Sequence, residues 1–243
     1  MRRFTATSPH TAPVLLLCGL SLVYWSKVLF TGHVLLPGAF LRGFAPFGAD
    51  PQAPWNILQW DALAQYYPWR AFAARQWQSG LIPLWNPHQF AGTPFLANGQ
   101  SAVFYPLNLP FWLLDVAFAF GVSALLHTLL ATLATYFLAQ HWQLSRAASL
   151  LAAIAFGFCG YLTAWVMLPT LANTASWLPL SLLLLERATD KERESGGKGE
   201  WRNADQATLI LSPILPFSHS PILAVALCCA LLAGHVQIFF YLL

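Results

Sequence analysis

The stretch Ala117–Leu138, AFAFGVSALLHTLLATLATYFL, contains no Asp, Glu, Lys or Arg. A helix that crosses the hydrocarbon core of a bilayer needs about 20 predominantly apolar residues. This stretch supplies them in one uninterrupted run. It therefore predicts a transmembrane helix.

The composition of the whole chain agrees with a membrane protein. Of the 243 residues, 57% are hydrophobic and 9% are charged, whereas about 25% are charged in an average soluble domain. Eleven of the charged residues lie between Glu186 and Asp205. This distribution excludes a soluble globular protein, a disordered chain and a disulfide scaffold. The small formal net charge of +3 argues against a nucleic-acid-binding protein.

The four cysteines carry no metal or redox signature. Cys18, Cys159, Cys228 and Cys229 all lie in long apolar runs and lack the spacing of Cys and His metal ligands. A cysteine in such a run is usually a small hydrophobic residue. We therefore predict no metal site and no disulfide from them.

Five apolar regions predict an all-α polytopic membrane protein with about five transmembrane helices. The expected order is an N-terminus, a first helix, a large first loop, three further helices, a charged linker and a fifth apolar region. These segments are 1–12, 13–30, 31–116, 117–186, 187–206 and 207–243. The three middle spans are expected near 117–138, 147–167 and 170–186. In the last region, 222–243 is the cleaner candidate because three prolines interrupt the residues before it.

Lys and Arg in the short loops orient these spans, since cytoplasmic loops carry an excess of positive charge. With a cytoplasmic N-terminus, eight of these residues fall inside and four outside. The loop 31–116 is then extracytoplasmic, and 187–206 is a solvated cytoplasmic linker. Residues 238–243 are apolar without a closing polar tail, so we expect the chain to be an N-terminal fragment of a longer protein.

The loop 31–116 holds ten of the 17 prolines and six of the 11 tryptophans. Trp and Tyr rings favour the headgroup level of a membrane, so this loop is expected on the membrane surface. Within it, Asp61–Ser79 has helical spacing of apolar residues, with Pro68 suited to a first turn and Gly80 to the helix end. We predict an interfacial amphipathic helix there. As an alternative, its aromatic residues only anchor the loop.

The segment that follows, Leu81–Pro106, is rich in Pro, Gly, Asn and Gln. The amides of Asn86, Asn98, Gln100 and Asn108 are able to bind a sugar or a lipid headgroup. The alternative is that these amides satisfy backbone groups of the loop itself.

Acidic residues are scarce outside the charged stretch Glu186–Asp205: the rest of the chain has three, Asp50, Asp61 and Asp115. A carboxylate beside a low-dielectric surface is a candidate general base. Asp61 begins the predicted helix, and Gln65 shares its face if the helix extends back that far. From spacing alone, Asp61 is more often a helix N-cap than a base. Asp50 is expected in a turn and Asp115 at the edge of the second span.

These segments also resemble a known family. The motifs that carry the resemblance are DALAQYYPWR (61–70), GLIPLWNP (80–87), GTP (92–94), NGQ (98–100), YP (105–106), WLPL (177–180) and GHVQ (234–237). Together they are similar to the YfhO-like bacterial membrane protein family, which is grouped with C-type glycosyltransferases (GT-C). In the last motif, Val236 stands where the family has Pro.

The resemblance implies a C-type glycosyltransferase fold, of which this chain would be the N-terminal part, in the bacterial inner membrane. It implies transfer of a sugar from a polyprenyl-phosphate donor to a cell-envelope glycan or glycolipid on the outer face. By position, Asp61 matches the catalytic acid of the first loop, while Arg70 and His88 are candidates to steady the lipid phosphate. The substrate-binding residues expected from the matched motifs are Gln65, Tyr66, Arg70, Trp85, Asn86, His88, Asn98, Gln100, Tyr105, His235 and Gln237.

Two other functional hypotheses are alternatives to a glycosyltransferase. One is a transporter or lipid-handling protein, which needs polar residues along its spans; here the spans offer His127 and a few hydroxyl groups. The other is an inactive truncated membrane protein. The expected partners are a lipid-linked sugar, an acceptor glycan and membrane lipids, without nucleic acid. We assign no cofactor, and a single acidic residue gives no basis for assigning a divalent metal.

Overall fold

The computed structural model describes residues 10–43, 46, 57–195 and 221–243 and is mostly helical in these ranges. Asp50 and the predicted linker beyond Ser195 lie outside the described residues. The helices are α1 (Thr11–Tyr24), α2 (Ser26–Phe30), α3 (Tyr67–Gln78), α4 (Leu109–Leu113), α5 (Val116–His141), α6 (Arg146–Gly157), α7 (Gly160–Ala164), α8 (Pro169–Ala175), α9 (Leu178–Ser195), α11 (Pro221–Leu232) and α12 (Val236–Leu242). Short 3-10 turns cover Gly38–Gly43, Ile57–Gln59, Gly99–Ser101 and Pro106–Asn108, a π-helical turn covers Ala62–Tyr66, and β1 (Trp85–Asn86) pairs with β2 (Thr93–Pro94).

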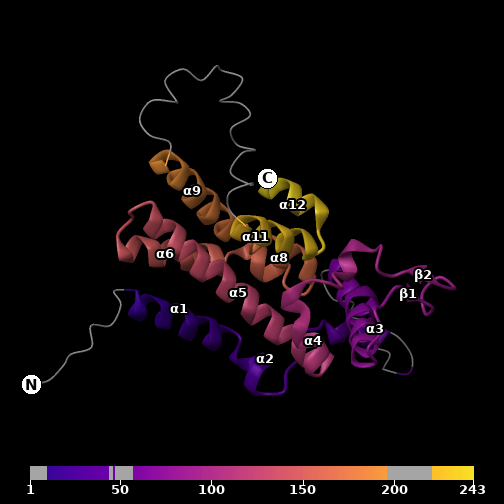
Figure 1. Cartoon of the computed structure of the whole chain (residues 1–243). Coiled ribbons are helices and arrows are strands. Elements are labelled where there is room, and N and C mark those ends of the chain that lie inside the picture. Colours follow the sequence, from indigo (N-terminus) through magenta and orange to yellow (C-terminus); the bar gives the residue numbers. More distant parts are fainter. Residues whose placement is uncertain (1–9, 44–45, 47–56, 196–220) are drawn as a thin grey trace, which may run out of the picture.

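Helix α5 lies at the centre of the structure and matches the predicted second span. Figure 1 shows α1, α6 and α9 alongside it, with α3, β1 and β2 gathered at one end. Asp115 begins the helix, because its Oδ1 accepts hydrogen bonds from the backbone N–H groups of Ala117 and Phe118 at 3.0 and 3.1 Å. Two helical stretches, Val116–His141 and Arg146–Ala164, are long and apolar enough to cross a membrane.

Helices α5 and α6 pack closely because small residues face the contact. The buried face of α6 is Ser149, Ala153 and Gly157, each four residues from the last. Ser149 Oγ accepts a hydrogen bond from Gln140 Nε2 at 2.7 Å. At the other end, a Cβ added to Gly157 would overlap Cγ2 of Thr132. Small residues at this spacing let two helix backbones approach each other, as in membrane helix pairs.

Gly157→Ala is expected to destabilise the α5–α6 pair by about 1–3 kcal/mol, because the new methyl group overpacks the contact. The double variant Thr132→Ser with Gly157→Ala is expected to recover most of this loss, since serine lacks Cγ2 but keeps the hydroxyl that bonds the Thr128 carbonyl. Thermal unfolding of the purified protein in detergent measures both. Equal stability of Gly157→Ala and wild type would contradict the close approach.

Each of the other predicted transmembrane spans forms, in its described residues, two helices rather than one continuous helix. The first, 13–30, divides at Trp25, whose indole Nε1 donates a hydrogen bond to Thr128 Oγ1 on α5 at 3.0 Å. The third and fourth divide into α6 with α7 and α8 with α9. Described residues of the fifth form α11 and α12, which are separated by a turn at Gly234.

Helix α9 also extends further than predicted. It continues to Ser195, through the first part of the segment 187–206 that was expected to be a linker. His141 Nε2 at the end of α5 lies 3.3 Å from Asp190 Oδ2 on this extension. This contact joins the extension of α9 to the neighbouring helix, and because both side chains are partly exposed it contributes little to stability.

The predicted interfacial helix forms, but its apolar face is buried in protein. Trp69, Phe72 and Ala73 of α3 pack in an aromatic core, where the rings of Phe72 and Phe95 lie 5.0 Å apart. This face is therefore unavailable to a lipid surface, which corrects the prediction. The helix ends as predicted at Gly80, whose φ of +72° lets the N–H of Leu81 bond back to the Gln76 carbonyl at 2.9 Å.

Candidate functional site

Asp61 lies at the entrance to a π-helical turn, Ala62–Tyr66, that runs directly into α3. Its side chain makes no helix-cap hydrogen bond, so the predicted N-cap role is wrong. Instead, Asp61 Oδ1 accepts a hydrogen bond from Gln65 Nε2 at 3.0 Å, as expected if the helix reached back to Asp61. Asp61 is partly buried, and among the residues that the structure describes its second carboxylate oxygen has no hydrogen-bond partner. π-helical turns are rare and often mark functional sites.

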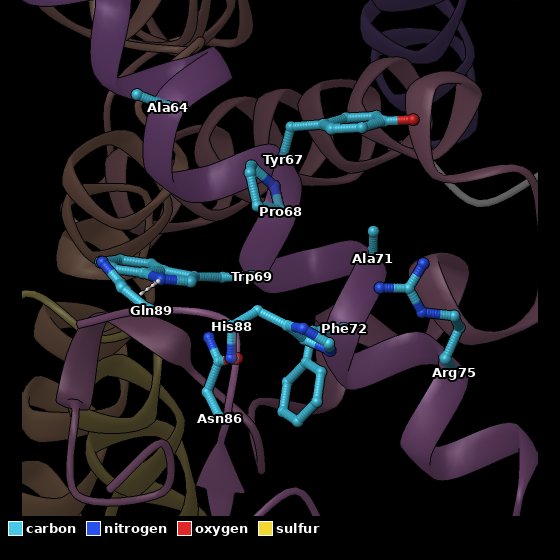
Figure 2. Close-up of a pocket in the computed structure, with 10 residues that line it drawn as sticks. All are labelled: Ala64, Tyr67, Pro68, Trp69, Ala71, Phe72, Arg75, Asn86, His88 and Gln89. Atoms are coloured by element: carbon cyan, nitrogen blue, oxygen red, sulfur yellow. Dashed lines mark hydrogen bonds between the residues drawn. The ribbon is translucent and has the colours of Figure 1, made fainter. Parts of the chain in front are cut away.

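A cavity of about 430 Å³ lies between α3 and the β1–β2 hairpin, and we call it the α3 pocket. Its lining residues are Ala64, Tyr67, Pro68, Trp69, Ala71, Phe72, Arg75, Asn86, His88 and Gln89. Figure 2 shows Arg75 extending from α3 on one side and Asn86, His88 and Gln89 on the other. Asp61 is not a lining residue, but Ala64, which is, follows it by three residues, about one helical turn along the backbone. The volume is in the range of small-ligand sites.

The hairpin that forms one wall of the α3 pocket is held by short-range contacts. Asn86 Oδ1 accepts the backbone N–H of His88 at 3.0 Å, and Gln89 Oε1 accepts the indole N–H of Trp69 at 2.9 Å. The ring of His88 meets Phe72 edge-on at 6.0 Å. The turn between the strands has three consecutive residues with positive φ, Phe90, Ala91 and Gly92. Positive φ at the bulky Phe90 is a strained conformation, and such strain clusters near functional sites.

Arg70 does not line the α3 pocket, contrary to the phosphate-binding role expected for it. Its side chain is 2% exposed, and Nη1 donates a hydrogen bond to the carbonyl of Ser101. The guanidinium lies 5.5 Å from the centre of the Phe111 ring, a favourable cation–π geometry. Burial lowers the pKa of Arg70 to about 10, so the group remains charged at neutral pH. Arg70 thus holds the loop 98–102 in place.

Tyr105 is also a structural residue. Its hydroxyl is buried and accepts the indole N–H of Trp177 at 2.8 Å, and it lies 2.6 Å from Nε2 of His127. Nδ1 of His127 lies 2.7 Å from the Ser123 carbonyl, which only accepts. Nδ1 therefore carries the hydrogen, and Nε2 accepts from Tyr105. Each polar atom in this series of hydrogen bonds, from Trp177 through Tyr105 to His127, has a partner. The Tyr105 hydroxyl is therefore not free to bind a substrate.

The amides of the loop 98–108 serve the backbone. Asn98 Oδ1 accepts the N–H of Gln100 at 3.2 Å, and Asn108 Nδ2 donates to the Ala102 carbonyl at 2.8 Å. For these two residues the backbone-satisfying alternative is confirmed. The side chain of Gln100 is partly buried, and the backbone of this loop meets a distant turn of the chain.

That distant turn is Gly234–His235, between α11 and α12. A Cβ on Gly234 would lie 2.6 Å from the Gly99 carbonyl oxygen and 3.1 Å from Cγ2 of Thr170. Thr170 Oγ1 in turn lies 2.9 Å from the hydroxyl of Tyr66, whose pKa burial raises. Three motifs far apart in sequence therefore meet. His235 Nδ1 accepts the N–H of Ile238 at 3.3 Å as an N-cap, and Gln237 Nε2 donates to the hydroxyl of Tyr241.

Gly234→Ala is expected to lower the stability of the fold by about 1–3 kcal/mol, since the φ of +99° and the nearby Gly99 carbonyl both oppose a side chain. The matched control is Gly19→Ala in the middle of α1, where a Cβ meets no atom within 4 Å. That control is expected to be neutral or to stabilise by about 0.5–1 kcal/mol. Protease resistance and thermal unfolding in detergent measure the difference, and equal behaviour of the two variants would contradict this contact.

Sequence reasoning missed Tyr67, Arg75 and Gln89, which line the α3 pocket. The signal was present for two of them, because Tyr67, Ala71 and Arg75 follow each other at four-residue spacing on one helix face. Of the predicted substrate residues, Asn86 and His88 line the pocket, while Trp85 lies on the exposed strand beside it. Within the described residues, no three His, Cys, Asp or Glu side chains gather to hold a metal ion.

The part of the chain that the structure describes is mostly helical and includes two helices that are long and apolar enough to cross a membrane. Residues 30–194, more than half of the chain, match the family described as bacterial membrane protein YfhO. The chain therefore belongs to the YfhO family of bacterial membrane proteins. No curated protein and no solved structure matches the chain.

Proposed function

We propose that this protein transfers a sugar from a polyprenyl-phosphate donor to a cell-envelope glycan or glycolipid on the outer face of the bacterial inner membrane. The proposal combines membership of the YfhO family with the chemistry of the loop region 31–116. In this arrangement the N-terminus is cytoplasmic, the chain crosses the membrane about five times, and the α3 pocket opens outside.

The observation that carries the proposal is the Asp61 carboxylate, which Gln65 orients three residues before Ala64 of the α3 pocket. Gln65 holds one carboxylate oxygen at 3.0 Å, which orients the group and leaves the other oxygen to accept a proton. The pocket offers the ring of Tyr67 and the amides of Asn86 and Gln89. Rings and amides of this kind suit a sugar, whose C–H faces and hydroxyl groups need both apolar contact and hydrogen bonds.

The proposed reaction is a displacement at the anomeric carbon of the donor. The acceptor hydroxyl oxygen forms the new bond to this carbon, while the bond from the carbon to the phosphate oxygen breaks. The phosphate leaves with the electron pair, and Asp61 accepts the proton of the attacking hydroxyl. Holding the base, acceptor and donor together lowers the barrier by orientation as well as by proton transfer.

Sugar transfer in native membranes tests this proposal. Membranes from cells that express the protein, and from cells that carry an empty vector, are incubated with a radiolabelled polyprenyl-phosphate sugar. We expect label to enter the envelope glycan or glycolipid fraction only in the expressing membranes. Equal incorporation in both membranes, across a panel of common hexose donors, would overturn the proposed activity.

A further inference from the structure

The α3 pocket offers hydrogen-bond donors, because each of its two amide oxygens already accepts a hydrogen bond from the protein while the amide NH₂ groups do not donate one within the described residues. Asn86 Oδ1 accepts from the backbone of His88, and Gln89 Oε1 accepts from the indole of Trp69. Within the described residues the two NH₂ groups, Asn86 Nδ2 and Gln89 Nε2, make no hydrogen bond, so they are free to donate to a ligand. Both are donors only.

Arg75 adds a positive charge to the same pocket. It lies in the last turn of α3, and its exposed guanidinium has no ion pair or side-chain hydrogen bond among the residues that the structure describes. His88 adds an imidazole ring, which carries an N–H in either neutral tautomer. No Asp or Glu is among the lining residues. A donor-rich, positively charged pocket without a carboxylate is complementary to an anion.

From this geometry we infer that the α3 pocket binds a phosphate ester through Arg75, Asn86, His88 and Gln89. The planar fork of an arginine matches the oxygens of a phosphate and binds two of them at once. Tyr67 and Phe72 give the pocket an apolar part for the group that the phosphate carries. The inference rests on the proposed function in one respect, because it takes the phosphate to be that of the lipid-linked donor. Arg70 is too deeply buried to contact this phosphate.

Direct binding of a short-chain prenyl phosphate tests the inference. Purified protein in detergent is titrated with geranyl phosphate, with inorganic phosphate and with geraniol, which lacks the phosphate. We expect geranyl phosphate to bind at least tenfold more tightly than geraniol, since hydrogen bonds to a charged group contribute about 1.5–3 kcal/mol each. Inorganic phosphate that binds as tightly as geranyl phosphate would identify free phosphate as the ligand. Equal binding of geranyl phosphate and geraniol would overturn the inference.

Two variants separate pocket chemistry from folding. Arg75→Gln removes the charge from an exposed side chain, and we expect a loss of affinity for geranyl phosphate of about 10–100-fold. Gln89→Glu keeps an oxygen for the Trp69 indole but replaces the donor by a negative charge, so it too should weaken binding at least tenfold. The matched control, Arg146→Gln, removes an exposed arginine at the start of α6 and should bind as wild type. Unchanged binding in both pocket variants would contradict the assignment.

The binding test and the sugar-transfer test give distinguishable negative results. If the protein binds geranyl phosphate through Arg75 but transfers no sugar, the phosphate site is supported and the proposed transferase activity is overturned. Conversely, sugar transfer with the same KM for the donor in Arg75→Gln as in wild type would keep the transferase and overturn the phosphate site.

Discussion

Asp61→Asn is expected to lower sugar transfer by about 100-fold or more, because a positioned general base contributes about 10²–10⁴-fold to a rate. Asparagine has the same shape, and its side-chain oxygen still accepts the hydrogen bond from Gln65 Nε2. The substitution therefore removes the proton acceptor without removing the contact that orients the side chain. Radiolabel incorporation in membranes, normalised to the amount of inserted protein, measures the effect.

The matched control for this prediction is Asp190→Asn. Asp190 lies on α9 and pairs with His141 at the end of α5, so it belongs to a different part of the fold. We expect this variant to insert and to transfer sugar as the wild type does. Asp61→Asn that retains more than half of the wild-type activity would refute the role of Asp61 as the base. Loss of activity in both variants would point to a general effect of removing charge.

Tyr105→Phe is expected to destabilise the protein by about 2–5 kcal/mol. The substitution deletes one hydroxyl and leaves two buried groups, the Trp177 indole N–H and His127 Nε2, without a partner. Each unsatisfied buried group costs about 1–3 kcal/mol. Thermal unfolding followed by intrinsic tryptophan fluorescence in detergent measures the loss.

Tyr24→Phe is the control for this experiment. Tyr24 lies at the end of α1 and is half exposed, so the same chemical change there should alter stability by less than about 0.5 kcal/mol. If Tyr105→Phe unfolds at the temperature of Tyr24→Phe, the chain from Trp177 through Tyr105 to His127 does not hold the helices together.

Structural features that depend on residues close together in the sequence can be predicted from the sequence alone. The uncharged run 117–138 predicts α5, Gly80 predicts the end of α3, and the four-residue spacing predicts that Gln65 meets Asp61. Each of these follows from helix geometry alone. The break at Trp25 does not, because it depends on a hydrogen bond to Thr128, which is distant in sequence.

The choice between Arg70 and Arg75 shows why the site itself was only partly predictable. Five residues apart on a helix, the two arginines point about 140° away from each other. Either one is equally suited to phosphate by composition. Only the packing of α3 against Ser101 and Phe111 decides that Arg70 is buried and that Arg75 lines the pocket. The same packing directs the apolar face of α3 into the protein.

The contact between Gly234 and the loop at Gly99 also sets an order of events during biosynthesis. The loop leaves the ribosome well before the turn that packs against it, and synthesis of the intervening residues takes on the order of ten seconds at about 5–20 residues per second. During that interval the backbone around Gly99 and Thr170 lacks its final partner. The loop region therefore completes its packing only after the chain has been synthesised as far as Gly234.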